Sequence, residues 1–96
     1  MTELTEAEAR ASADRYLQET ITPRFERELA IRSSFDKGRV WIFSWDSKEF
    51  LENRALIYKA VVGAGPIVVE KDSGEVWLAS AIPSVEEQII ERSRNR

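Results

Sequence analysis

Two pairs of acidic residues have the type and spacing that could support acid–base chemistry. Asp46 lies three residues before Glu49, and Asp72 lies three residues before Glu75. Paired carboxylates of this kind act as acid and base in glycoside hydrolysis. Nothing in the spacing requires that chemistry, because acidic residues in turns are usually solvated or bonded to local amides. We therefore assign no catalytic residue.

The 96 residues contain no histidine and no cysteine. Without histidine the usual general base is missing, so a Ser-His-Asp or Cys-His arrangement is excluded. Without cysteine there are no thiolate nucleophiles, disulfides or cysteine-based zinc sites, and this composition fits the cytosol. The sequence thus predicts a protein that is not an enzyme and that carries no cofactor and no metal.

A Gly-x-Gly pattern occurs in the segment Gly63-Ala64-Gly65-Pro66. Such a pattern cradles phosphate when it opens a helix, but this segment leads into a predicted strand. A flexible loop with proline at the start of the next strand explains it adequately. We predict no phosphate site.

An aromatic stripe is formed by Trp41, Phe43 and Trp45, which alternate along one predicted strand. In one interpretation the stripe is the core face beneath the helices, since each ring buries about 150–250 Å². In the other, Trp45 at the strand end lies in an exposed patch used for binding. Acids beside such a patch would steer a basic partner. The predicted partner-binding surface combines residues at the strand end with the tip of a hairpin: Trp45, Asp46, Glu49, Asp72 and Glu75.

Helices are predicted at both ends of the chain. The segment Thr5-Glu6-Ala7-Glu8 fits a capping box that opens a helix to about Glu19, which Pro23 stops. A second box, with Ser84 as N-cap and Glu87 at the third position, opens a closing helix over residues 85–93.

Strands are predicted between the two helices. Residues 25–32 alternate between apolar and charged side chains, and a turn follows over residues 33–38. Residues 40–45 are apolar on both faces, which is typical of a central strand. Residues 48–52 suit a short edge segment or a helical turn. Residues 67–69 and 76–79 flank a polar turn with Gly74, which predicts a hairpin.

This order of elements predicts one α+β domain spanning residues 1–96. Sequential strands with short turns favour an antiparallel sheet of four or five strands. We expect a two-layer sandwich with the N-terminal and C-terminal helices on one face of the sheet. A hydrophobic edge strand could support a homodimer, although no residue requires one.

Charge and hydropathy exclude two classes of partner. The net charge is −3, and neither half of the chain is a basic arm, so nucleic acid and anionic membranes are poor partners. The longest nearly apolar run, residues 60–69, is too short for a membrane span, which needs about 20 residues. The first six residues do not form a secretory signal, so we expect a cytoplasmic protein.

The chain resembles the YrhB-domain family, also called immunity protein 35, over nearly its whole length. The most specific similarity is the run from Gly65 to Val76, Gly-Pro-Ile-Val-Val-Glu-Lys-Asp-Ser-Gly-Glu-Val. Also similar are the Trp-x-Phe strand at Trp41, the Ser47-Lys48-Glu49-Phe50-Leu51 segment and the Ile82-Pro83 entry to the last helix. The resemblance implies a small α+β bacterial protein that neutralises a cognate toxin by binding it, with no catalytic motif to transfer.

Two functional hypotheses follow. The first is a cytoplasmic immunity protein that binds and blocks a cognate toxin domain. The second is a chaperone-like stress protein that holds unfolded chains, because a relative is described in that way. The first predicts one specific partner, and the second predicts a broad apolar patch with weak, promiscuous binding.

Overall fold

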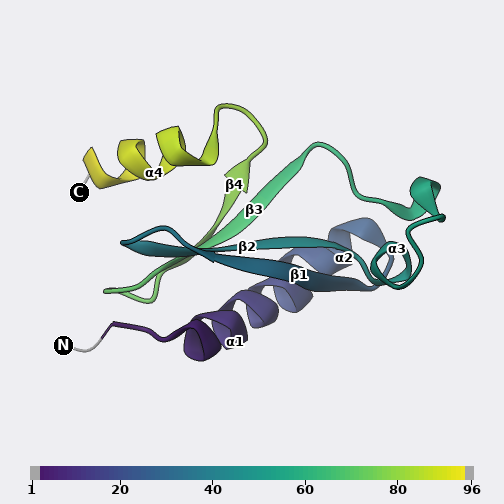
Figure 1. Cartoon of the computed structure of the whole chain (residues 1–96), viewed down its shortest axis with the longest axis horizontal. Helices are drawn as coiled ribbons and strands as arrows, with labels where there is room; N and C mark the ends of the chain where they lie inside the picture. The colour runs from purple at the N-terminus through teal and green to yellow at the C-terminus, as the bar shows by residue number, and fades with distance from the viewer. Residues whose placement is uncertain (1–2, 95–96) are drawn as a thin grey trace.

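The computed structural model describes residues 3–94 and contains one antiparallel sheet with a helix at each end of the chain (Figure 1). The strand order is β1-β2-β3-β4, so each strand pairs with its neighbour in sequence. The α+β class, the antiparallel sheet and the two terminal helices are therefore confirmed. The elements in chain order are α1 (Glu6–Tyr16), the π-helical turn η1 (Leu17–Ile21), α2 (Thr22–Phe25), β1 (Leu29–Asp36), β2 (Val40–Ser47), α3 (Lys48–Glu52), the 3₁₀ turn η2 (Ile57–Lys59), β3 (Ala64–Glu70), β4 (Val76–Ser80) and α4 (Val85–Arg94).

The two terminal helices lie on opposite faces of the sheet, whereas we expected both on one face. In Figure 1, α1 lies below the sheet and α4 above it. The reason is the double-sided apolar character of β2: Phe43 and Trp45 point into the α1 cluster, while Val40 and Ile42 point into the α4 cluster. Successive side chains of a strand face opposite ways, so both faces had apolar surface to bury.

The larger core lies between α1 and the sheet. Helix α1 begins with the predicted capping box, in which the Thr5 hydroxyl accepts from the Glu8 amide and the Glu8 carboxylate accepts from the Thr5 amide. Small side chains at helical spacing, Ala9 and Ala13, let the helix lie close to the sheet. The buried members of this core are Ala9, Ala13, Leu17, Ile21, Leu29, Phe43, Trp45, Ile67 and Val69.

Pro23 does not end the N-terminal helix. A π-helical turn over Leu17–Ile21 precedes it, and helical backbone continues through α2 to Phe25. Pro23 is the second residue of α2, a position at which the missing N–H leaves no hydrogen bond unmade. The helix ends instead at Glu26, whose backbone is left-handed with φ of 53°. The predicted strand from residue 25 therefore begins only at Leu29.

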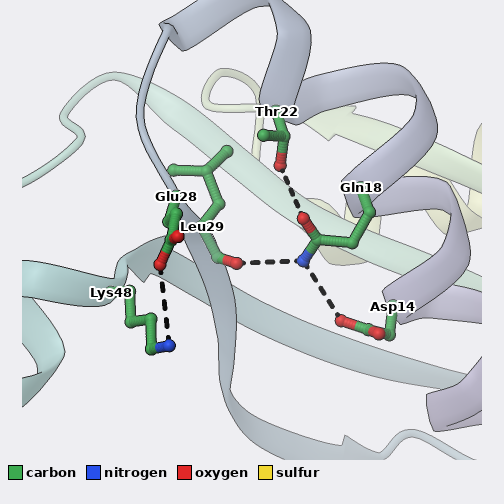
Figure 2. Close-up of polar contacts among 6 residues, drawn as sticks. All are labelled: Asp14, Gln18, Thr22, Glu28, Leu29 and Lys48. Atoms are coloured by element: carbon green, nitrogen blue, oxygen red, sulfur yellow. Dashed lines mark hydrogen bonds and ion pairs between the residues drawn. The ribbon is translucent and has the colours of Figure 1, made fainter.

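A side-chain network fastens the π-helical turn to the start of β1 (Figure 2). The Gln18 amide nitrogen donates to the Leu29 carbonyl at 3.0 Å and to Asp14 at 3.4 Å, and the Thr22 hydroxyl donates to the Gln18 oxygen at 3.1 Å. Beside it, Lys48 and Glu28 form an ion pair at 3.6 Å. These contacts fix the position of the π-helical turn relative to the first residues of β1.

A β-bulge in β1 changes which face its side chains occupy. The pairing runs Ile31↔Trp45 and then Ser33↔Ser44, so Arg32 is the extra residue. Leu29 and Ile31 consequently belong to the α1 face. Phe35 pairs with Ile42 and lies on the α4 face.

Candidate partner-binding surface

Trp45 is part of the core. Its exposed fraction is 8%, its indole N–H donates to the Gly65 carbonyl at 3.0 Å, and its ring meets Phe25 edge-on with centroids 5.7 Å apart. Trp45 therefore lies in the core, as the first interpretation of the aromatic stripe predicts. The expected exposed patch at this residue does not form, because α2 brings Phe25 over the strand end.

Asp46 is also buried, with an exposed fraction of 7%. Its Oδ1 accepts hydrogen bonds from the backbone amides of Ser47 and Val61, each at 2.7 Å. The carboxylate thereby ties the long segment between α3 and β3 to the end of β2. Asp46 shapes the surface beside it and is not itself displayed, which corrects the expectation that it forms part of an exposed acidic rim.

The other predicted site residues are exposed, but they lie at two ends of the sheet. Glu49 in α3 pairs with Lys59 at 3.8 Å. Asp72 and Glu75 lie in the β3–β4 turn, where Glu75 pairs with Arg92 of α4. Figure 1 shows α3 at one end of the long axis and both hairpin turns at the other.

The strand register explains this separation. Val40 at the start of β2 pairs with Glu70, next to the hairpin tip, while Asp46 lies six residues further along β2. At a rise of roughly 3.3 Å per residue, this distance is about 20 Å. The five predicted residues therefore do not form one continuous surface.

A concave groove lies on the α4 face of the sheet. It encloses about 450 Å³ and lies over β1, β2 and the start of β3. Its residues come from four separate segments of the chain. They are Arg32, Phe35, Lys37, Ile42, Ser44, Trp45, Asp46, Val61, Ala64, Gly65, Pro66 and Val85.

Gly65 in the groove is required by a close approach of two backbones. A Cβ at this position would lie 2.2 Å from the Ala79 carbonyl oxygen, inside the β3–β4 ladder. The Gly-x-Gly pattern is thus explained by strand packing.

The charged groups of the groove are mostly cationic. Lys37 forms an ion pair with Glu86 of α4 at 3.5 Å, with both side chains about half exposed. Arg32 is exposed and makes no ion pair within residues 3–94. The Asp46 carboxylate is buried and occupied by amides.

Exposed apolar side chains occur on the loops around this groove. Val62 follows the groove residue Val61 and is 87% exposed, and Ile82 precedes α4 and is 86% exposed. Phe35 is half exposed on the groove floor. Ile57 and Tyr58 extend the exposed apolar surface along the same segment as Val62.

A polar cluster braces the opposite end of the sheet. The Lys71 ammonium lies 2.7 Å from the Asp36 carboxylate and 4.7 Å from the centre of the Trp41 ring. This ammonium and the Gly38 amide lower the pKa of Asp36 below its ordinary value. The cluster joins the β1–β2 turn to the end of β3.

Two further observations concern metal ions and membranes. Within residues 3–94, no group of three or more histidine, cysteine or acidic residues is placed to hold a metal ion. No helix in the same range has the length and apolar character that crossing a membrane demands.

The groove was missed by reasoning from the sequence. Arg32 was expected at the end of a strand and Phe35 within the turn over residues 33–38, and no residue type marks the bulge that changes the face occupied by Phe35. One feature of the sequence pointed toward it: β2 is apolar on both faces, which indicated that a second face of the sheet must also be covered by other residues.

Comparison with known proteins identifies the family. The family model for Immunity protein 35 matches residues 7–89, which include every strand, nearly all of α1 and the first half of α4. No curated protein matches the chain, and no solved structure does. The family match covers most of the chain, and the chain belongs to the immunity protein 35 family.

Proposed function

We propose that this chain is a non-catalytic immunity protein that binds a cognate toxin domain and neutralises it in the cytoplasm. The observation that carries the proposal is the family match over residues 7–89. Inhibition by binding requires surface complementarity and no reactive side chain. A chain without histidine or cysteine suits that mode of action.

The exposed apolar side chains support a binding role. Phe35, Val62 and Ile82 are between 50% and 87% exposed. Phe35 lines the groove, and Val62 follows the groove residue Val61. Interfaces concentrate their binding energy in a few large apolar or aromatic residues that become desolvated on association. These residues are the anchors that we assign to the toxin contact.

The predicted acidic residues receive a secondary role. Glu49, Asp72 and Glu75 are exposed at the two ends of the sheet, and we propose that they guide the approach of the partner. Trp45 and Asp46 support the interface indirectly, because they hold Gly65 and Val61 in place.

The proposal is tested with the toxin domain encoded by the gene adjacent to that of this chain. Bacteria expressing that domain are expected to survive only when this chain is co-expressed. The two purified proteins should also co-elute as one complex. An unrelated small α+β protein expressed at the same level is the control. Growth arrest despite co-expression, with separate elution at micromolar concentrations, would contradict the proposal.

A second candidate function is the holding of unfolded chains. The observation that favours it is the closely spaced trio Ile57, Tyr58 and Val62, each at least 75% exposed. This function predicts slower aggregation of a heat-denatured model client at a several-fold excess of this chain. If aggregation is not slowed and a one-to-one toxin complex forms, the immunity role is supported and the holding of unfolded chains is contradicted.

A further inference from the structure

We propose that the groove on the α4 face receives the toxin, and that the toxin segment entering it carries an apolar side chain next to a carboxylate. This inference rests on the proposed function and deepens it by naming the surface and the chemistry of the bound segment. The segment is a surface loop of a folded partner, since a groove of about 450 Å³ accommodates side chains and not a domain.

The first argument is the incomplete cover on this face of the sheet. Helix α4 has ten residues and is about 15 Å long, while the eight residues of β2 extend over about 26 Å. Contacts place α4 over one half of the sheet: Lys37 with Glu86, Arg39 with Ser93, and Arg92 over the Trp77 ring. In Figure 1, α4 lies above the end that carries the hairpin turns. The groove begins beside Val85 at the start of α4 and extends over the part of this face that the helix leaves uncovered.

The second argument is the β-bulge at Arg32. Uninterrupted alternation from Leu29 would point Phe35 toward α1, where it could be buried. The bulge instead pairs Phe35 with Ile42 on the α4 face and leaves it 50% exposed. Bulges commonly re-aim side chains beside functional sites. The Phe35 ring therefore lies on an uncovered face and belongs to neither of the two cores.

The third argument is the charge of the groove. Arg32 is its one cation without an ion pair in the part of the chain that the structure describes, and Lys37 adds a second, partly neutralised cation. The acid in the lining, Asp46, is buried and bonded to amides. A partner carboxylate would therefore meet a guanidinium that can bind it in a bidentate manner. A basic partner segment would be repelled.

The fourth argument is the rigidity of the walls. Asp46 holds the Val61 amide at 2.7 Å on one side, and Trp45 holds the Gly65 carbonyl at 3.0 Å. Across the floor, the hydroxyl groups of Ser33 and Ser44 lie 2.6 Å apart. A surface held in this way loses little conformational freedom on binding, which favours affinity.

The apolar part is tested by comparing Phe35→Ser with Ile90→Ser. Ile90 is 54% exposed and lies on α4 outside the groove, so the two changes remove similarly exposed apolar side chains. The dissociation constant for the adjacent-gene toxin domain is measured by calorimetry. We expect Phe35→Ser to weaken binding by about 10- to 100-fold and Ile90→Ser by less than about threefold. Equal effects of the two variants would overturn the assignment.

The charge part is tested by comparing Arg32→Glu with Arg15→Glu, which alters net charge equally on the exposed surface of α1. Arg32→Glu is expected to weaken binding at least about tenfold, while Arg15→Glu changes it little. Unchanged melting temperatures establish that the variants are folded. A tighter complex with Arg32→Glu would overturn the acidic-segment assignment.

Three further outcomes are distinguishable. A complex that forms with wild-type affinity in both groove variants keeps the proposed function and overturns this site. The absence of any complex with the wild-type chain overturns the proposed function, and the site with it. A wild-type homodimer that dissociates on Phe35→Ser would show that a second copy occupies the groove, which contradicts the toxin assignment.

Discussion

At the scale of single residues, buried side chains that looked like binding groups prove to be structural. Trp45 and Asp46 are both nine-tenths buried, and each bonds to the backbone near the start of β3. Tryptophan suits an interface because its ring is large and its N–H is directed, and the same two properties suit a core. Residue type alone could not separate these uses.

Replacement of Trp45 by Phe tests that structural role. The change removes the N–H that satisfies the Gly65 carbonyl, and an unsatisfied buried acceptor costs about 1–3 kcal/mol. We expect the free energy of unfolding in urea to fall by that amount. Trp41→Phe is the matched control, because its indole bonds to the Leu4 carbonyl at a less buried position and should cost less. An equal or larger effect of Trp41→Phe would contradict this account.

Asp36 gives the chain a defined acid sensitivity. Its pKa is lowered by the Lys71 ammonium and the Gly38 amide, so folding favours the ionised carboxylate. The resulting stabilisation is fully present above the unfolded-state pKa of about 4 and is lost as the pH falls through the lower folded-state pKa. Chemical denaturation should show wild-type stability decreasing below about pH 4.

The variant Asp36→Asn isolates this effect. It should be less stable than the wild type at pH 6, and the difference should shrink as the pH falls toward 2 and the wild-type carboxyl takes up a proton. Asp72→Asn is the control, because Asp72 is exposed in the β3–β4 turn. A difference between wild type and Asp36→Asn that stays constant from pH 6 to pH 2 would argue against the ion pair.

At the scale of elements, the edge of β4 is partly capped by a side chain from α4. The Gln88 side-chain amide donates to the Ser80 carbonyl and accepts from the Ser80 amide, each at 2.8 Å. This pair of bonds matches what a neighbouring antiparallel strand would make. The same amide also donates to the Pro83 carbonyl, which fixes the loop before α4.

Gln88→Ala is therefore expected to lower stability and to open the strand edge. Loss of these exposed hydrogen bonds should cost about 1 kcal/mol. An uncapped edge offers backbone groups to another chain, so the variant should self-associate more at high concentration. Light scattering after size-exclusion chromatography measures the second effect, with Glu91→Ala on the same helix as the control. A monomeric Gln88→Ala variant of wild-type stability would refute the capping role.

Local sequence patterns predicted an element correctly where its boundary depends on one nearby residue, such as a helix cap or a turn glycine. The capping residues Thr5 and Ser84 marked both helix starts, and Gly74 marked the β3–β4 turn, where its φ is 77°. Pro23 misled because it is the second residue of α2, where a missing N–H is tolerated, so the helix continues to Phe25 and β1 starts later than predicted. The bulge at Arg32 depends on pairing with β2, so alternation within one strand could not show it.

At the scale of the whole molecule, the sheet has one closed face and one half-open face. Helix α1 and the following turns cover the first, while α4 covers only part of the second. The candidate site could not be predicted because it depends on this asymmetry. Because both helices were expected on one face, the shorter predicted closing helix did not point to a partly uncovered second face. The exposed predicted acids, Glu49, Asp72 and Glu75, lie at the two ends of the sheet and outside the lining of the groove.

The central claim is that the toxin covers the half-open face, and hydrogen–deuterium exchange on the toxin complex tests it most directly. The account predicts slower exchange in residues 32–37, 61–66 and 82–85 on complex formation, with little change in α1. Core amides of β2 report whether the chain stays folded. Protection confined to α1, or to the β3–β4 turn, would contradict the account.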